Sequence, residues 1–399
     1  MQAQQVLHKL LMNTCANIHK TRRESLEALV QSALIGQRLT VTDLGRSIQS
    51  DTSHKHNIKQ ADRLLSNPHI HAESIEIYRA LYHQHIGLQT RPVILIDWSD
   101  MDDYKQHFVL RATIAMEGRS ITLYQETHTI ETKEKRSSHR AFLQQLKMLL
   151  PMTCQPILVT DAGFRTTWFL EVAEQGWDWV GRVRNRHYMR WANGGRWFNA
   201  KRCYEKATTR PVYLGEGILT QRNQVSCQFV LYQGKLKGRK HKNRLGDIAA
   251  NSYSRKQAAR QREPWLLATS LPVTSKLAKK IVNIYRLRMQ IEESFKDTKS
   301  HRFGLSLDYH RCKSAMRLQI MLLISTLASL VFWLLGLATI ISGQHRQFQA
   351  NSIKHKRVLS IVFIGRLVVR NMQISLSGVD IRKAWEKLNE ILYVHQWQH

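Results

Sequence analysis

The segment from Ile281 to Lys299, IVNIYRLRMQIEESFKDTK, has the residue types and the spacing that chemistry at phosphate esters would need. It contains no Gly or Pro and is rich in helix formers, which predicts one long helix. At about 100° per residue, one sector of this helix carries a phenol, two cations and a carboxylate, namely Tyr285, Arg288, Lys299 and Glu292. Glu293 projects to the far side. This sector is suited to binding phosphate groups, although a salt-bridged helix rim has the same composition.

Two further acids, Asp97 and Asp161, each follow a short apolar run that predicts a buried strand. Ligand sites of open α/β sheets lie at such strand ends. An apolar stripe on the predicted helix indicates that it packs on the same sheet; its members are Ile284, Leu287, Ile291 and Phe295. Three neighbouring carboxylates repel one another unless divalent cations bind, and oxygen ligands suit Mg²⁺. The sequence therefore predicts a magnesium site made by Asp97, Asp161 and Glu292.

The chain carries a large excess of positive charge. Its 60 Lys plus Arg against 30 Asp plus Glu give a formal net charge of +30 over 399 residues. This excess is spread over the whole length, which favours a nucleic-acid partner over a membrane or a merely basic surface. Its five cysteines are isolated and form no CxxC pair, so we expect reduced thiols in a cytosol. The first twenty residues lack the pattern of a signal peptide.

Hydrophobic periodicity predicts three domains. Residues 1–88 are expected to be helical, residues 89–340 to form a mixed α/β sheet with covering helices, and residues 341–399 to be a basic, helical region. The strands of the middle domain are predicted in RPVILIDWSD, HFVLRATIAM, RSITLYQETHTI, PILVTDAGF, WDWVGRVRN and EPWLLATSLPV. A segment at about 190–262 interrupts this core, beginning near WANGGRWF and including antiparallel strands such as QVSCQFVLYQ.

Two regions are candidates for contact with a polyanion. In the first domain, Thr42 is expected to cap a short helix, and Lys55, Lys59 and Arg63 share one face of the next helix because they are four residues apart. The two helices resemble a helix-turn-helix reader of DNA, although many surface helices carry such stripes. The segment between Lys235 and Arg262 holds ten Lys or Arg and one acid. We expect it to be mobile without a polyanion, with a solvated linker as the alternative.

One stretch raises the question of a membrane. The 22 residues from Ile320 to Ile341 carry no charge and are long enough to span a bilayer. They include Ser and Thr residues, and they lie in a basic chain with no second run of this kind. We therefore expect a buried core helix, with an integral membrane protein as the alternative.

These motifs resemble those of the DDE transposases of bacterial insertion sequences, and more narrowly those of the insertion-sequence-four family. The resemblance rests on the order Asp97, Asp161, Glu292 and on the helix spacing Tyr-x2-Arg-x3-Glu-x6-Lys. It covers nearly the whole chain through LTVTDLGRS, HNIKQADRLL, VILIDWSD, VTDAGF, EPWLLAT and VNIYRLRMQIEESF. It implies an RNase H-like core with a β-rich insertion, a helical N-terminal domain that grips the transposon end, and a C-terminal region used in pairing.

The resemblance also implies which residues hold metal ions and DNA. Two Mg²⁺ ions, for which Mn²⁺ can substitute, would be held by the catalytic acids Asp97, Asp161 and Glu292. Phosphates near the cleaved end would be contacted by Tyr285, Arg288 and Lys299. Trp265 would stack on a base flipped out of that end, because an aromatic face offsets part of the cost of unstacking. A tryptophan in the core at a strand start is the alternative.

By the same resemblance, the activity would be cut-and-paste transposition: nicking of each end, hairpin formation, hairpin opening and joining to target DNA. The partners would be double-stranded DNA, as terminal inverted repeats and as target, and a second copy of the chain in the DNA-bound complex. The location would be the bacterial cytoplasm, at the nucleoid when DNA is bound. A decayed transposase acting as a repressor is a non-catalytic alternative, but it would not need the three acids.

Overall fold

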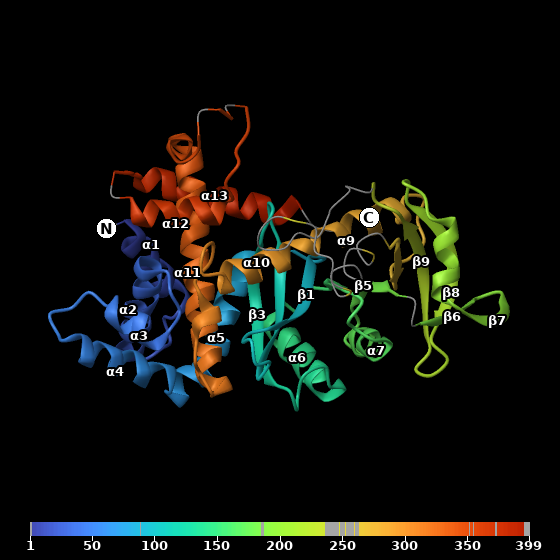
Figure 1. Ribbon diagram of the computed structural model, residues 1–399, viewed down its shortest axis with the longest axis horizontal. Helices are drawn as coiled ribbons and strands as arrows, with labels where there is room; N and C mark the ends of the chain where they lie inside the picture. The colour runs from blue at the N-terminus through green and yellow to red at the C-terminus, as the bar shows by residue number, and fades with distance from the viewer. Residues whose placement is uncertain are drawn as a thin grey trace. The chain divides into compact units, whose positions relative to one another are not determined.

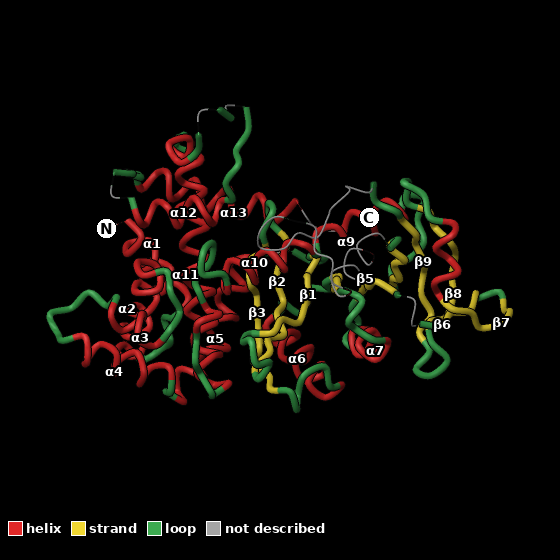
Figure 2. The backbone as a smooth tube through the Cα atoms, in the orientation of Figure 1, coloured by secondary structure: helices red, strands yellow, loops and turns green. Residues whose placement is uncertain are grey.

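The computed structural model describes residues 2–87, 89–184, 187–235, 247, 252, 259, 263–350, 352–353, 355–371 and 373–394. It divides into two compact units (Figure 1). The first unit comprises Met1–Pro156 and Met289–His399, and the second comprises Ile157–Arg288. Helices predominate in the first unit and strands in the second, as the tube in Figure 2 shows. The predicted mixed α/β class is confirmed.

The first unit combines a three-stranded sheet with a large set of helices. Its helices are α1 (Gln2–Thr14), α2 (Lys20–Gly36), α3 (Val41–Arg46), α4 (His54–Leu65), α5 (Pro68–Ile86), α6 (Arg136–Leu149), α10 (Met289–Lys299), α11 (Ala315–Ile341), α12 (Ile361–Arg370) and α13 (Gly378–Val394). Its strands are β1 (Val93–Asp100), β2 (His107–Ala115) and β3 (Ser120–Thr129). They pair antiparallel in the order β3-β2-β1. Every residue of β2 is buried, because helices cover both faces of this sheet.

Helix α11 is the core helix of the first unit. By length and composition it could cross a membrane, but 94% of its most apolar window is buried inside the protein. Two of its hydroxyls are satisfied within the helix, since Thr326 and Thr339 donate to carbonyls four residues back. The structure thus supports the expected core helix.

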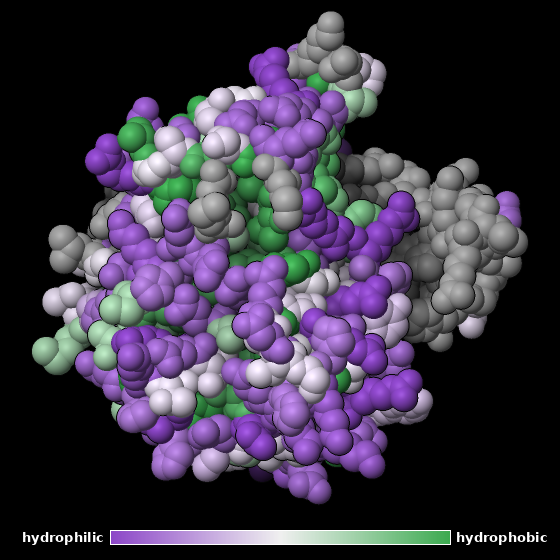
Figure 3. Space-filling model, turned by 90° about the vertical axis from the view of Figure 1, so that its left-hand side faces the viewer, coloured by the Kyte–Doolittle hydropathy of each residue, from purple (hydrophilic) through white to green (hydrophobic). Residues whose placement is uncertain are grey.

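Helices α3 and α4 lie against each other in the N-terminal part of the first unit. The cap of α3 is Thr40, whose Oγ1 accepts the N–H of Asp43 at 3.1 Å, so the prediction that Thr42 caps this helix is wrong. A side chain at Gly45 would collide with the backbone of Ile58, so glycine lets the two helices approach closely. Figure 3 views the molecule from the side that carries these helices, and hydrophilic side chains predominate there.

The second unit is built on one mixed sheet. Its strands are β4 (Ile157–Thr160), β5 (Asp178–Val183), β6 (Tyr188–Trp191), β7 (Gly194–Asn199), β8 (Val212–Leu219), β9 (Val225–Tyr232) and β10 (Trp265–Thr269). Their order is β4-β5-β10-β9-β8-β6-β7, with β4 and β5 parallel and the other neighbours antiparallel. Its helices are α7 (Thr166–Glu174), α9 (Leu277–Leu287) and the 3-10 helix η1 (Ala200–Lys206). The predicted basic segment after Lys235 lies almost wholly outside the described residues.

The segment Ile281–Lys299 is not one helix. It is divided into α9 and α10 at Arg288, whose N–H donates to Tyr285 three residues back although its backbone angles remain helical. Directly after the break, the amide side chain of Gln290 forms hydrogen bonds with the N–H and the carbonyl of Met116, both at 2.7 Å. These bonds attach α10 to the first unit, whereas α9 buries its apolar face in the second. Tertiary contacts therefore override local helix propensity at this point.

Candidate active site

Asp97 lies within strand β1 rather than at its end. The apolar run ends before it as predicted, but pairing with β2 continues to Asp100, so the predicted strand boundary is wrong. Across the sheet, Asp97 stands opposite Arg111 of β2, and Arg111 stands opposite Gln125 of β3. Directly opposed residues of antiparallel strands point to the same face. One polar row, Asp97–Arg111–Gln125, therefore crosses the three strands on a single face.

Helix α10 covers the face that carries this row. The guanidinium of Arg111 lies 4.2 Å from the ring centre of Phe295, and its Nη1 reaches Thr298 Oγ1 at 3.5 Å. The opposite face belongs to α6, because the indole N–H of Trp98 donates to His139 at 3.2 Å. Consecutive strand residues alternate between faces, so Asp97 points to the side of α10.

Lys299 joins the end of α10 to the end of β1. Its Nζ donates to Ser99 Oγ at 3.1 Å and to the carbonyl of Asp100 at 2.9 Å. Ser99 is two residues beyond Asp97 and shares its face. Burial lowers the pKa of Lys299. The structure thus uses this predicted phosphate ligand to hold the helix that carries Glu292 against the strand that carries Asp97.

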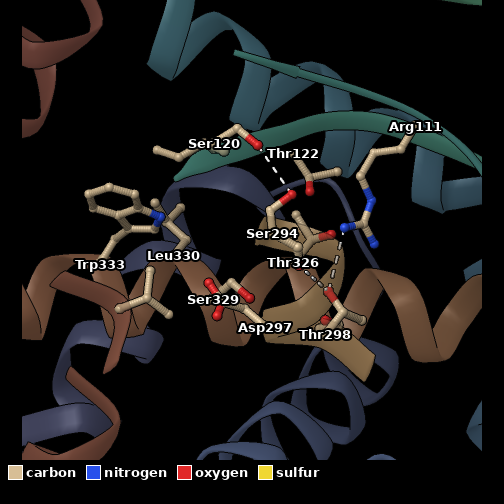
Figure 4. A pocket seen from close by; sticks show the side chains of 13 residues that line it. Arg111, Ser120, Thr122, Ser294, Asp297, Thr298, Thr326, Ser329, Leu330 and Trp333 are labelled. Atoms are coloured by element: carbon tan, nitrogen blue, oxygen red, sulfur yellow. Dashed lines mark hydrogen bonds between the residues drawn. The ribbon is translucent and has the colours of Figure 1, made fainter. Parts of the chain in front are cut away.

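Behind α10, Arg111 is buried to 2% exposure. Its Nε donates to Gln125 at 2.8 Å, and Gln125 in turn donates to Tyr78 and Thr326 at 3.1 and 3.0 Å. Burial lowers the pKa of Arg111 to about 10, so it stays protonated at neutral pH. It lines a polar cavity of about 30 Å³ (Figure 4), together with hydroxyl groups of α10, α11 and β3 and the carboxylate of Asp297. This buried network fixes α10 on the sheet.

The two adjacent acids of α10 have different surroundings. Glu293 forms ion pairs with Arg119 at 3.4 Å and Lys296 at 3.9 Å. Glu292 is exposed, and it lies on the same side of α10 as Lys299, because seven residues are nearly two full turns. The first unit therefore brings Asp97, Glu292 and Lys299 to one side of its sheet.

In the second unit, Asp161 directly follows the fully buried strand β4, as predicted. Its Oδ1 accepts the N–H of Gly163 at 2.7 Å, which orients the half-buried carboxylate. Burial raises the pKa of Tyr285, and the charge of Asp161 raises it further, while Arg288 and Arg182 act in the opposite direction. Tyr285 is therefore within electrostatic range of both Asp161 and Arg288.

Trp265 stands at the start of β10 with half-buried rings between two tyrosines. Its ring centre is 5.0 Å from that of Tyr285, edge to face, and 5.7 Å from that of Tyr232. Arg288 forms a hydrogen bond with the Tyr285 hydroxyl, and its guanidinium lies 5.9 Å from the ring centre. Since Tyr285 itself is buried, it supports Trp265 and Arg288 more than it presents a surface of its own.

The remaining predicted DNA ligands lie on α4. Lys55, Lys59 and Arg63 are all exposed, whereas the opposite face of this helix is buried through Asn57, Ala61, Leu64 and Leu65. The predicted basic face is thus present on the first unit.

Comparison with known proteins decides the family. Residues 88–330 match the family described as Transposase DDE domain, which is more than half of the chain. The chain belongs to the DDE transposases. No curated protein matches it. As a DDE transposase it is a DNA-cleaving enzyme whose substrate is DNA, and domains of this kind generally use divalent metal ions.

The donor set of this transposase suits a hard cation. Among the described residues, no three or more His, Cys, Asp or Glu side chains are gathered closely enough to hold a metal ion. The candidate ligands are two carboxylates of the first unit, Asp97 and Glu292, and one of the second, Asp161. All are oxygen donors, the type that Mg²⁺ prefers.

Arg111 is the residue of this transposase that the sequence analysis missed. It stands in HFVLRATIAM, a strand whose other residues around it are apolar. An arginine is rarely buried without polar partners, so a lone cation in such a run is a signal for a buried network. Gln125, in the next predicted strand, carries the same signal.

Proposed function

We propose that this transposase excises its own insertion sequence and joins it to target DNA by a cut-and-paste route. The observation that carries the proposal is the placement of Asp97 and Glu292 on one side of the β1–β3 sheet, with Lys299 and Arg111 fixing strand and helix. In this route, each end is nicked, the freed 3′-hydroxyl attacks the opposite strand to form a hairpin, the hairpin is opened, and the ends are joined to target DNA. Every step is a phosphoryl transfer, so one site serves them all.

We assign Asp97, Asp161 and Glu292 as the catalytic acids and the ligands of two Mg²⁺ ions, which Mn²⁺ can replace. Such ions would activate the attacking hydroxyl and stabilise the leaving oxygen. The chain's own contribution is orientation: the bond from Gly163 holds Asp161, and the Lys299 and Arg111 contacts hold the strand and helix of the other two acids.

We assign DNA contacts to both units. Arg288 would bind phosphates near the cleaved end as a bidentate donor, with Tyr285 orienting it through the hydroxyl and the ring. Trp265, half-buried between Tyr285 and Tyr232, would stack on a flipped base. Lys299 has three N–H donors, of which two bond to Ser99 and Asp100, and the third would bind a phosphate.

The wider assignment follows the sequence resemblance. We place the core in the RNase H-like class and the chain in the insertion-sequence-four family, near the transposase of transposon Tn-ten. Lys55, Lys59 and Arg63 would contact the terminal inverted repeats, and two copies of the chain would hold two ends. The enzyme would act in the bacterial cytoplasm.

The test compares Glu292→Gln with Glu293→Gln. Purified proteins are incubated with labelled duplex carrying the element's own end, with and without Mg²⁺. Glu292→Gln should lose cleavage by about 1,000-fold or more while end binding persists, because about 4 kcal/mol of transition-state stabilisation is lost. Glu293→Gln should cleave within about threefold of wild type, because its ion pairs are partly exposed. Equal losses would refute the assignment of Glu292, and wild-type binding without cleavage in Mg²⁺ or Mn²⁺ would indicate a repressor.

A further inference from the structure

The hairpin of β6 and β7 forms one end of the second unit's sheet. β7 is last in the order of the described strands, and the hairpin projects beyond β8 (Figure 1). Its strands pair from Tyr188↔Asn199 to Trp191↔Gly194. A short edge strand with charged side chains is a poor template for another protein strand. This edge is therefore better suited to a partner other than a protein strand.

The tip of the hairpin is narrow. Gly194 and Gly195 have φ values of +99° and +102°, in the region that favours glycine, and a Cβ at either position would meet no atom within 4 Å. Both glycines and the following Arg196 are exposed. A two-stranded β-ribbon of this kind fits the major groove of B-DNA.

The two faces of the hairpin differ. On the inner face, Trp191 packs 5.7 Å from Phe198 and 6.0 Å from Phe229, ring centre to ring centre, which holds the hairpin on the sheet. On the other face, the guanidinium of Arg190 lies 5.2 Å from the ring centre of Trp197. The hairpin is thus anchored by aromatic packing on one face and carries the half-buried Arg190 over Trp197 on the other.

The hairpin and η1 carry a local excess of positive charge. Residues 187–206 include five cations, Arg190, Arg196, Lys201, Arg202 and Lys206, and one acid, Glu205. Throughout the described part of the chain, no carboxylate forms an ion pair with any of these five. Unpaired cations on a projecting element favour a phosphate backbone.

A hollow of about 420 Å³ lies beside η1, lined by Asn199, Lys201, Arg202, Tyr204 and Glu205. The hydroxyl of Tyr204 is buried and has no hydrogen-bond partner among the described residues. Burial raises the pKa of Tyr204, so the hydroxyl keeps its proton and can donate. Phosphate oxygens in the hollow would pair with the exposed Lys201 and Arg202.

The order of the strands gives the distance to Asp161. β7 is six strand spacings from β4, and at about 4.8 Å per spacing this is roughly 25–30 Å once sheet twist is allowed for. B-DNA rises about 3.4 Å per base pair, so this span corresponds to about seven to nine base pairs.

We propose that the β6–β7 hairpin and η1 bind DNA on one side of the cleaved bond, with the hairpin tip in a groove about seven to nine base pairs away and Lys201 and Arg202 on the backbone between, because η1 packs on β9 and β10. This inference rests on the proposed function, since it takes the bond at Asp161 as the origin of the distance. Contacts of this type position the duplex without reading its sequence.

The test removes Lys201 and Arg202 together by alanine substitution. Arg210→Ala with Arg222→Ala is the matched control, because both arginines are exposed on the same unit and the charge change is equal. Affinity is measured against salt concentration with two duplexes carrying the element's end, one with about 20 base pairs and one with about 5 base pairs on each side of the cleavage site. On the long duplex, K201A/R202A should flatten the slope of log K against log salt by about 1.8 and weaken binding about tenfold.

Further outcomes separate this inference from the proposed function. On the short duplex, Arg196→Ala at the hairpin tip should bind with the wild-type slope, whereas K201A/R202A should still show a flatter slope, because η1 packs on β9 and β10, closer to β4. On the long duplex, hydroxyl-radical protection about seven to nine base pairs from the nick should be lost in Arg196→Ala. An unchanged K201A/R202A slope would overturn the η1 contact, and equal losses of Arg196→Ala on both duplexes would overturn the hairpin contact. Failure of the wild type to cleave would instead count against the proposed chemistry, while the slopes would still test the hairpin.

Discussion

In the first unit the strand and helix that carry the candidate catalytic acids are held together by buried charges and hydrogen bonds, whereas in the second unit a cluster of aromatic rings, Tyr232, Trp265 and Tyr285, contacts Arg288. Lys299 and Arg111 attach α10 to β1 and β2 through contacts of 2.9–3.5 Å, and Arg111 is buried. In the second unit, the charge of Asp161 acts on Tyr285, and Tyr285 contacts Arg288 and Trp265.

This difference in surroundings indicates two tasks, orientation of the acids and contact with the DNA substrate. Buried charged groups cost desolvation energy and contribute little stability, but their hydrogen bonds hold groups in one geometry, which catalytic carboxylates require. Aromatic rings and an arginine offer stacking and bidentate phosphate contacts, which a DNA substrate uses. In the proposed function, the first unit would therefore orient Asp97 and Glu292, and the second would make most of the substrate contacts.

The largest effect is expected from Asp97→Asn. It should lower cleavage by about 1,000-fold, because it removes one charged ligand from the set of three acids. Asp100→Asn, three residues along the same strand, should stay within about threefold, since its partners Lys105 and Lys133 form partly exposed pairs. Strand-cleavage rates on end duplex measure both. A similar loss in the two variants would mean that β1 as a whole, not Asp97, matters.

A smaller and step-specific effect is expected from Trp265→Ala. The first nick should be kept, whereas hairpin formation should fall about 10- to 100-fold, because stacking on one base is worth about 1–3 kcal/mol. Trp265→Phe is the control and should recover most of the hairpin yield. Gel analysis of nicked and hairpin products separates the steps. If Trp265→Ala forms hairpins at the wild-type rate, the second unit's aromatic cluster is a structural core.

The smallest effect is expected from Arg111→Met, which tests whether the buried network positions α10. Cleavage should fall about 10-fold, as for other groups that support metal ligands. Thermal unfolding should change little, because a hydrophobic chain of similar size replaces a desolvated charge. Apparent Mg²⁺ affinity is the decisive measurement, since a purely structural role would leave it unchanged. Arg111→Lys should show an intermediate value, because it keeps the charge but loses the paired donors.

Local pattern predicted much of this protein. The strands around Asp97 and Asp161, the covering helices, the buried helix α11 and the basic face of α4 all follow from apolar periodicity, which depends on residues only a few positions apart. The spacing of Tyr285, Arg288, Glu292 and Lys299, with the two Asp, was enough to indicate the DDE family, which the comparison then established. Charge alone pointed to a polyanionic partner.

Only the tertiary structure decided how these pieces are held. The Asp97–Arg111–Gln125 row depends on strand register. Lys299 is separated in sequence from its partners Ser99 and Asp100 by 200 and 199 positions. The break at Arg288 arises because α9 and α10 bury their faces in different units, which no helix propensity records. A sequence specifies which residues prefer to be buried or helical, but the partner that satisfies a buried charge is chosen when distant segments pack together.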